Sequence, residues 1–375
     1  MTRDAAQRRR WTFYEAIKGH GEFTNRANRR MDEQMADHKE KGIISGLLIF
    51  AALYVFLLPF PLLAQEITPF QTQNQSPLVQ IFGLPAPDEA FILSKGKAKI
   101  RLVADIANSY IADSTPRENV LLDGESYRFT SAGRYGIGHG VELGIEVPYV
   151  SYSGGFLDGF IDSWHKAFGF PEGGRTLAPR NRLFFSYQRN HVEKRRIDDA
   201  NSGLGDLRLT GGLRLFEKKG EGAGALALRT SLKLPTGDSD FLHGSGSTDL
   251  ALWLIGSRDF PWAYGLFSLW GSAGFMALTT GQVLADQQRN WVGLGSMGIG
   301  YRPFSWIALK IQANGHTSLY KDSDLRELSM YSIQLLTGGT IFFSKNVNLD
   351  IAVSEDVIVK TSPDAVFHFA LNYKF

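Results

Sequence analysis

The last ten residues of the chain, V-F-H-F-A-L-N-Y-K-F, constrain its fold more than any other stretch. Phe367, Phe369, Leu371, Tyr373 and Phe375 fall on every second position, and mostly smaller or more polar residues lie between them. A β-strand has a two-residue period, so one face of this strand is aromatic and the other is mixed. A soluble β-sandwich would bury the aromatic face and would rarely end on it. The closing strand of a bacterial outer-membrane barrel presents that face to lipid, so this ending predicts an all-β transmembrane barrel.

The same two-residue alternation of apolar and polar side chains begins near residue 98 and recurs along the chain up to this last strand. In K-A-K-I-R-L-V-A-D-I (97–106), for example, apolar residues alternate with Lys99, Arg101 and Asp105. Most runs are about 10 to 14 residues long, which suits a tilted strand that crosses a bilayer. They begin near Ala98, Gly124, Val141, Asp206, Ala223, Asp249, Ala263, Asn290, Ser305, Leu328, Asn346 and Ala365. We therefore predict an antiparallel barrel of about 12 strands, an even number.

The connections between these runs alternate in length. The short ones are 136–140, 217–222, 258–262, 302–305 and 344–346. The longer ones are 112–123, 153–203, 236–247, 277–288, 318–327 and 359–364. Outer-membrane barrels have short periplasmic turns and long external loops, which is the same pattern. A thirteenth strand candidate, 180–190, would break the even count, so we place it inside an external excursion at 153–203.

Composition agrees with a barrel and excludes several other classes. The mean hydropathy of −0.14 is too low for a bundle of membrane helices, but lumen-facing residues keep a barrel polar on average. The formal net charge of +2 provides no electrostatic argument for binding nucleic acid. The chain has no cysteine, which excludes disulfides, thiolate catalysis and thiolate metal sites.

The segments before the barrel are interpreted as targeting and lead-in regions. Residues 1–41 form a charged N-terminal extension, and the uncharged run 42–64 has the length and flanks of a signal peptide cut near Ala64. Two alternatives stay open: a start at Met31 or Met35, and a retained inner-membrane anchor followed by a soluble β domain. Residues 65–94 lack clear periodicity and are expected to be a periplasmic lead-in to the barrel at 95–375.

Two sets of motifs resemble known families. S-L-K-L-P-T-G-D-S-D (231–240) and G-S-G-S-T-D-L (244–250) resemble outer-membrane proteins of the meta-pathway phenol-degradation family. L-L-D-G-E-S-Y-R-F (121–129), S-G-G-F-L-D-G-F-I-D-S-W-H (153–165), S-E-D-V-I-V (354–359) and S-P-D-A-V-F-H-F-A-L (362–371) resemble domain-of-unknown-function family 3187. This resemblance covers about 95–375 and implies an outer-membrane location without an established activity. A transport role is implied only by analogy with the first family.

The inward face of the predicted strands carries many charges, because a charge on the lipid face would cost up to a few kcal/mol. The expected lumen-lining residues are Lys99, Arg101, Arg128, Arg134, Glu142, Glu146, Arg208, Arg214, Arg229, Lys233, Lys310 and Asp350. Such residues either line a hydrophilic path or pair across the barrel and fill it.

One predicted strand, S-W-I-A-L-K-I-Q-A-N-G-H-T-S, places Lys310, Gln312, Asn314, His316 and Ser318 in a single inward row. His316 and Ser318 share a face, and Asp322 is a carboxylate that could orient the histidine. That set follows the nucleophile–base–orienter order of a lipid hydrolase. The alternative interpretation is a solvated row at the barrel rim.

The external excursion is rich in aromatic residues. Phe156, Phe160, Trp164 and Phe168 lie on a predicted amphipathic helix, which we interpret as a gate over the barrel mouth or as ordinary loop packing. No histidine spacing suits a metal site, and the glycine-rich 293–300 stretch is a strand rather than a phosphate loop. We therefore expect no metal and no cofactor.

Together these observations predict a porin-like outer-membrane barrel of a Gram-negative bacterium. Its expected activity is passive passage of small solutes, with apolar solutes as one option. A lipid hydrolase and a sealed structural or adhesive barrel are the alternatives. The expected partners are outer-membrane lipid, an unidentified small solute and the barrel-assembly machinery. That machinery would read the last strand through Tyr373 and Phe375.

Overall fold

The computed structural model describes residues 66–159, 179–357 and 361–375. The predicted charged extension (1–41) and signal region (42–64) lie outside these residues. Within the described ranges, no helix is long and apolar enough to cross a membrane.

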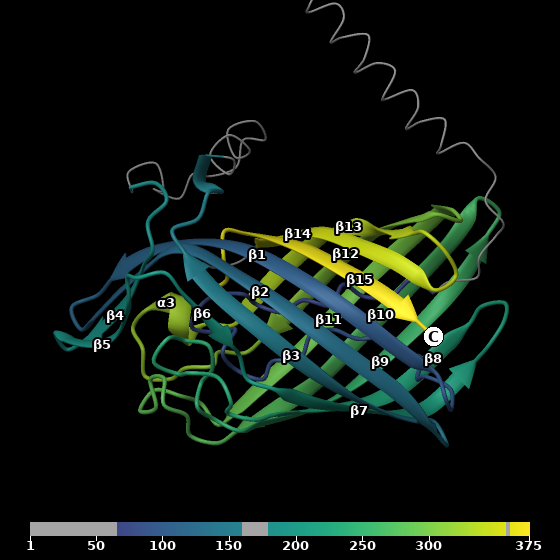
Figure 1. Ribbon diagram of the computed structural model, residues 1–375, viewed down its shortest axis with the longest axis horizontal. Helices are drawn as coiled ribbons and strands as arrows, with labels where there is room; N and C mark the ends of the chain where they lie inside the picture. The colour runs from purple at the N-terminus through teal and green to yellow at the C-terminus, as the bar shows by residue number, and fades with distance from the viewer. Residues whose placement is uncertain (1–65, 160–178, 358–360) are drawn as a thin grey trace, which may run out of the picture. The chain divides into compact units, whose positions relative to one another are not determined.

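Twelve antiparallel strands form a closed ring (Figure 1). The ring consists of β1 (Ala98–Ser114), β2 (Glu118–Gly138), β3 (Val141–Ser153), β7 (Arg208–Lys218), β8 (Gly224–Lys233), β9 (Asp249–Trp262), β10 (Gly265–Leu278), β11 (Trp291–Phe304), β12 (Ile307–His316), β13 (Ser332–Phe342), β14 (Val347–Asp356) and β15 (Ala365–Lys374). The last strand closes the ring on the first, with Leu371 opposite Leu102. The predicted all-β barrel of about 12 strands is thereby confirmed.

The two ends of the barrel differ. Tight connections (139–140, 219–223, 263–264, 305–306 and 343–346) and the C-terminus define what we call the turn end. Longer segments gather at the opposite, loop end. One expected loop is wrong: 112–123 is largely strand, because β1 and β2 stay paired out to Ser114 and Asn119. Val120 and Leu122 in this arm are buried, and their burial favours the extended pairing.

Three short strands extend the sheet at the loop end without entering the ring. β4 (Phe184–Arg189) pairs with the outer part of β2, β5 (Val192–Ile197) pairs with β4, and β6 (Asn201–Leu204) pairs with the outer part of β3. The run 180–190 is therefore a strand outside the ring. A single turn of helix, α3 (Arg326–Ser329), precedes β13, so that strand begins at Ser332 rather than near Leu328.

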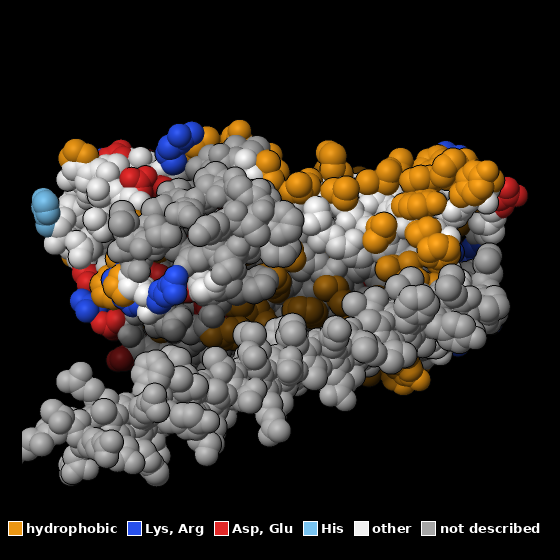
Figure 2. Space-filling model, turned by 90° about the horizontal axis from the view of Figure 1, so that it is seen from above, with side chains coloured by type: hydrophobic (Ala, Val, Ile, Leu, Met, Phe, Trp, Pro, Cys, Tyr) orange, Lys and Arg blue, Asp and Glu red, His pale blue; other side chains and the backbone are white. Residues whose placement is uncertain are grey.

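The outer surface of the ring is apolar, and hydrophobic side chains gather over it in Figure 2. Phe375 is 52% exposed, and its ring contacts Tyr373 at 4.4 Å between centroids. Aromatic pairs at other turn-end connections, Trp262–Tyr264 and Phe304–Trp306, complete an interfacial girdle. A closed barrel with an apolar exterior and an aromatic girdle is the architecture of a bacterial outer-membrane protein.

Residues 66–93, which we call the plug, occupy the inside of the ring, and nearly all of them are buried. The expectation of a periplasmic lead-in over 65–94 is therefore wrong. The plug has no strand or helix of its own, so its backbone polar groups need partners elsewhere. The inward-facing side chains of the barrel supply those partners.

Candidate functional site: the plugged lumen

The first part of the plug, an ascending arm over 66–75, runs beside β12. Lys310 Nζ donates to Thr68 O at 2.9 Å, and Asn314 Nδ2 donates to Thr72 O at 3.3 Å. Between them, Gln312 bonds both the N–H and the carbonyl of Phe70. Each contact joins residues 242 apart in the sequence, because both segments are extended and advance equally per residue. The side chains of this row on β12 thus make the hydrogen bonds to the plug backbone that a neighbouring strand would otherwise make.

The top of the plug is held by apolar packing at the loop end. Leu78, Ile81 and Phe82 are buried in one cluster with residues of the β1–β2 arm, the β4–β5 hairpin and the external loops. Tyr320 donates its hydroxyl to Leu78 O at 2.7 Å. This end of the lumen is filled by the main hydrophobic cluster of the described residues.

Gly83 follows the turn over 77–82, where the plug reverses. Its N–H donates to Asp249 Oδ2 at 2.7 Å, and a Cβ added there would lie 2.8 Å from Asp249 Cβ. Any residue with a Cβ would therefore clash with Asp249 and force this part of the plug away from β9. Arg208 donates to the carbonyls of Phe82 and Leu84, both at 3.0 Å. The P-T-G-D-S-D motif (235–240) belongs to the loop that surrounds this turn, where Gly237 N–H donates to Asp206.

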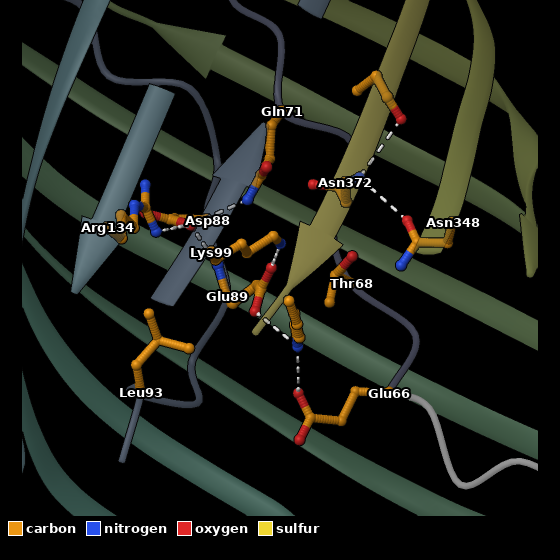
Figure 3. A network of polar contacts seen from close by, with 12 residues as sticks. Glu66, Thr68, Gln71, Asp88, Glu89, Leu93, Lys99, Arg134, Asn348 and Asn372 are labelled. Atoms are coloured by element: carbon orange, nitrogen blue, oxygen red, sulfur yellow. Dashed lines mark hydrogen bonds and ion pairs between the residues drawn. The ribbon is translucent and has the colours of Figure 1, made fainter. Parts of the chain in front are cut away.

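The descending arm, 85–93, returns through buried ion pairs. Asp88 pairs with Arg134 at 2.5 Å, and Glu89 pairs with Lys99 (Figure 3). Arg229 donates to Glu89 O at 3.0 and 2.7 Å. Several wall cations are thus held by the carboxylates and carbonyls of the plug.

The seam that closes the barrel depends on one of these carboxylates. Lys99 on β1 lies directly opposite Lys374 on β15. Like charges in register across a strand pair are destabilising. Glu89 pairs with Lys99 and lies 3.5 Å from Lys374, so the plug supplies the anion that the seam lacks.

The predicted lumen-lining residues lie on the inner face and differ in how deeply they are buried. The buried members are Lys99, Arg101, Arg128, Arg134, Glu142, Arg208, Arg229, Lys233, Lys310 and Asp350. Glu146 is part-buried. Arg214 lies opposite the buried Ala227 on the inner face, just before the bulge of β7, and its exposed side chain pairs with Glu217 at 2.6 Å near the turn end.

The proposed hydrolase residues do not form a triad. His316 Nδ1 lies 2.9 Å from Thr317 O, and its Nε2 lies 3.0 Å from Asn74 Nδ2 in the plug. Ser318 Oγ contacts two backbone carbonyls, those of Tyr320 and Leu328, at 2.5 and 2.7 Å. The contacts resolved for these described side chains include no hydrogen bond between His316, Ser318 and Asp322. The row binds the plug instead.

The aromatic gate falls mostly outside the described residues. Phe160, Trp164 and Phe168 lie outside the described residues. Phe156 is described and is exposed at the edge of the excursion. The aromatic gate therefore stays a prediction. In the described ranges, no group of three His, Asp or Glu side chains is placed to hold a metal ion.

Free space in the lumen is concentrated at the turn end. A cavity of about 660 Å³ opens there between Glu66, Phe91 and Arg302. Above it, two spaces of about 30 Å³ each lie beside the plug. The lumen is therefore an open vestibule below a closed interior.

Sequence reasoning missed the plug. One signal was present: in T-P-F-Q-T-Q-N-Q (68–75), Gln71, Gln73 and Gln75 alternate with other residues, as in an extended segment. The polar spacing of this run matches that of K-I-Q-A-N-G-H (310–316), which holds it. Neither run by itself says that the two lie side by side.

Residues 46–375 match the model of a family described as "Protein of unknown function (DUF3187)". The chain belongs to the DUF3187 family. This assignment agrees with the resemblance seen in the sequence motifs and extends it upstream through the plug. A search of curated proteins finds no match to this DUF3187 chain.

Three solved structures are similar to this chain at low sequence identity. The COG4313 outer membrane channel from Pseudomonas putida F1 is 13% identical over 77% of this chain and 99% of that chain, with a TM-score of 0.47. The translocator domain of the autotransporter NalP from Neisseria meningitidis is 9% identical, covering 76% and 90%, with a TM-score of 0.36. Pseudomonas putida OprB is 8% identical, covering 75% and 93%, with a TM-score of 0.30.

Proposed function

We propose that this DUF3187 protein is a passive outer-membrane channel for small solutes and that the plug is its gate. One observation carries the proposal: Lys310, Arg208 and Arg229 each bind backbone carbonyls of the plug. Water can replace a carbonyl as a hydrogen-bond acceptor, so the wall would stay solvated if the plug withdrew. A wall that held the plug through apolar side chains alone would not be solvated in this way.

The class of solute is proposed from the wall near the loop end. An apolar depression of about 430 Å³ lies over β11 and β12, where Gly295 lies opposite Gly315 and neither residue has a side chain. The small inner space beside Thr72 is bounded by the same two glycines. Only a two-strand ladder separates the two spaces. This thin wall supports small apolar solutes as the cargo, with an exit toward lipid.

A disulfide between plug and wall tests the gate. A Cβ built on Gly300 lies 3.5 Å from Ile67 Cβ, within the Cβ–Cβ range for a disulfide. The natural chain has no cysteine that could compete for the new pair. The Ile67→Cys/Gly300→Cys variant should therefore form a single reversible lock. We expect solute flux into liposomes and single-channel conductance to fall when the lock is oxidised and to recover on reduction.

The two single-cysteine variants are the matched controls, and both should be insensitive to oxidant. Equal flux in the locked and reduced forms would show that the plug is not the gate. Flux indistinguishable from empty liposomes in every form, wild type included, would exclude transport and favour the sealed structural or adhesive barrel.

A further inference from the structure

A second feature of the lumen lies between the plug and strands β1, β2, β3 and β7. A space of about 30 Å³ there is lined by Arg101, Arg128 and Arg208, together with Asp105 and Glu146. The three arginines are 4%, 6% and 4% exposed. Three buried arginine side chains therefore line one small space.

The two carboxylates in the lining are already engaged. Asp105 accepts from His368 Nδ1 at 2.7 Å and from Gln75 Nε2 at 3.3 Å. Glu146 is 3.8 Å from Arg134 and 4.0 Å from Arg208. Three arginines against two carboxylates leave the lining with an excess of one positive charge.

Arg101 is the clearest case. Within the described part of the chain, its guanidinium has no hydrogen bond and no ion pair, and its buried Nε lacks a partner. Among the residues that the structure describes, Arg128 has one hydrogen-bond partner, Gln80 O at 3.3 Å. A buried charge without a partner is costly, so this arrangement requires an anion or water in the space.

The unpartnered polar atoms around the space are mainly donors. Arg101 Nε, Arg208 Nε and Gln73 Nε2 are buried donors without an acceptor, whereas Gln75 Oε1 is the one buried acceptor of the lining without a donor. Water would serve donors and acceptors equally. An excess of cationic donors favours an anion.

We propose that this space is a binding site for a small monovalent anion of chloride size, held between the plug and the wall. A volume of about 30 Å³ holds roughly one or two particles the size of water, which suits a halide and excludes sulfate or phosphate. Because Gln73 belongs to the plug and the arginines to the wall, the anion would fasten the closed state. This site is independent of whether any solute crosses the barrel.

Bromide provides a direct test on the full-length protein. Crystals grown with sodium bromide should show an anomalous peak among Arg101, Arg128 and Arg208. In detergent, the unfolding temperature should rise saturably with chloride or bromide relative to gluconate at equal ionic strength. Sulfate should not reproduce that rise.

Arg101→Gln should abolish both the peak and the halide-dependent rise, and Arg101→Lys should retain part of them if the glutamine variant does not fold. Arg117→Gln is the control, because Arg117 is an exposed arginine that pairs with Asp324 at the loop end. Ordered water without an anomalous peak in the wild type, or an equal halide effect in Arg101→Gln, would overturn the site.

Discussion

Gln312 on the barrel wall binds Phe70 of the plug at two points. The N–H of Phe70 donates to Gln312 Oε1 at 2.8 Å, and Gln312 Nε2 donates to Phe70 O at 2.9 Å. One side-chain amide thus makes the two hydrogen bonds that a neighbouring strand would make. This is the central contact of the ascending arm.

Replacing this amide should loosen the arm. Gln312→Leu keeps the approximate volume but leaves two buried backbone groups unpaired, at a cost of about 1–3 kcal/mol each. We expect hydrogen exchange at the Phe70 amide to accelerate by more than tenfold while the strands stay protected. Gln188→Leu, at an exposed amide on β4, is the control. Unchanged exchange at Phe70 would contradict a holding role for Gln312.

Glu89 should stabilise the seam between β1 and β15. Glu89→Gln removes the anion between Lys99 and Lys374 and leaves buried positive charge, which costs about 3–5 kcal/mol when a buried pair is broken. The folded form should therefore be lost at a lower temperature in heat-modifiability gels. Lys374→Gln in the same background should restore part of the loss, and Glu193→Gln on exposed β5 should have no effect. Loss without rescue would argue against charge at the seam.

Ser318 is expected to be structural rather than catalytic. Its hydroxyl contacts the carbonyls of Tyr320 and Leu328, so Ser318→Ala should lower stability by about 1 kcal/mol. Release of fatty acids from outer-membrane lipid should stay at the level of liposomes without protein, in wild type and variant alike. Protein-dependent release that the substitution removes would restore the hydrolase hypothesis.

His243 should make the loop between β8 and β9 sensitive to acid. Burial lowers the pKa of His243 below its ordinary value of 6.5, and the ring stacks on Tyr152 while Nε2 contacts Asn201 Oδ1 at 2.8 Å. A lowered pKa means that the neutral ring is favoured in the folded state. The stabilisation that neutral His243 gives the folded loop is therefore complete above pH 6.5, and it is lost as the pH falls through the pKa of His243 in the folded state.

Limited proteolysis of the external loops at pH 7.5 and pH 5 measures this effect. Cleavage near residues 234–248 should increase at pH 5 in the wild type and depend less on pH in His243→Gln. His191→Gln, at an exposed hairpin position, is the control. Identical pH profiles in wild type and His243→Gln would exclude His243 as the cause.

Phe375 should matter for assembly more than for stability. Its ring is half exposed on the outer surface, so Phe375→Ala removes little packing. If the assembly machinery reads the last strand, the variant should show several-fold less folded protein in the outer membrane. Phe343→Ala, at another exposed turn-end aromatic, should be close to wild type. An equal loss of folded protein in both variants would show that the aromatic girdle as a whole, rather than Phe375 in particular, is needed for assembly.

Much of the barrel was predictable because each strand carries its own signal. Ile100, Leu102 and Ala104 alternate with Lys99, Arg101 and Asp105, and lipid on one side and a polar lumen on the other require that alternation. The bounds were less predictable where tertiary contacts prolong a strand. β2 begins at Glu118 because β4 pairs with its outer part, which a local pattern does not reveal.

The candidate site was predicted in part. The row of Lys310, Gln312, Asn314 and His316 was correctly placed on one inward face, but its partner was not. A polar row on a strand has the same pattern whether it contacts water, substrate or another segment of chain. Only the fold shows that residues 242 positions upstream fill the space in front of it.

By itself, the sequence determined the closed all-β barrel, its even strand number and its lipid-facing surface, since those follow from a period of two and the cost of placing charge in lipid. Only the tertiary structure decided that residues 66–93 fill the lumen. That segment has no strong periodicity, and its burial depends on hydrogen bonds and ion pairs to residues far away in the chain. The wall charges that line the barrel are therefore partners of the plug.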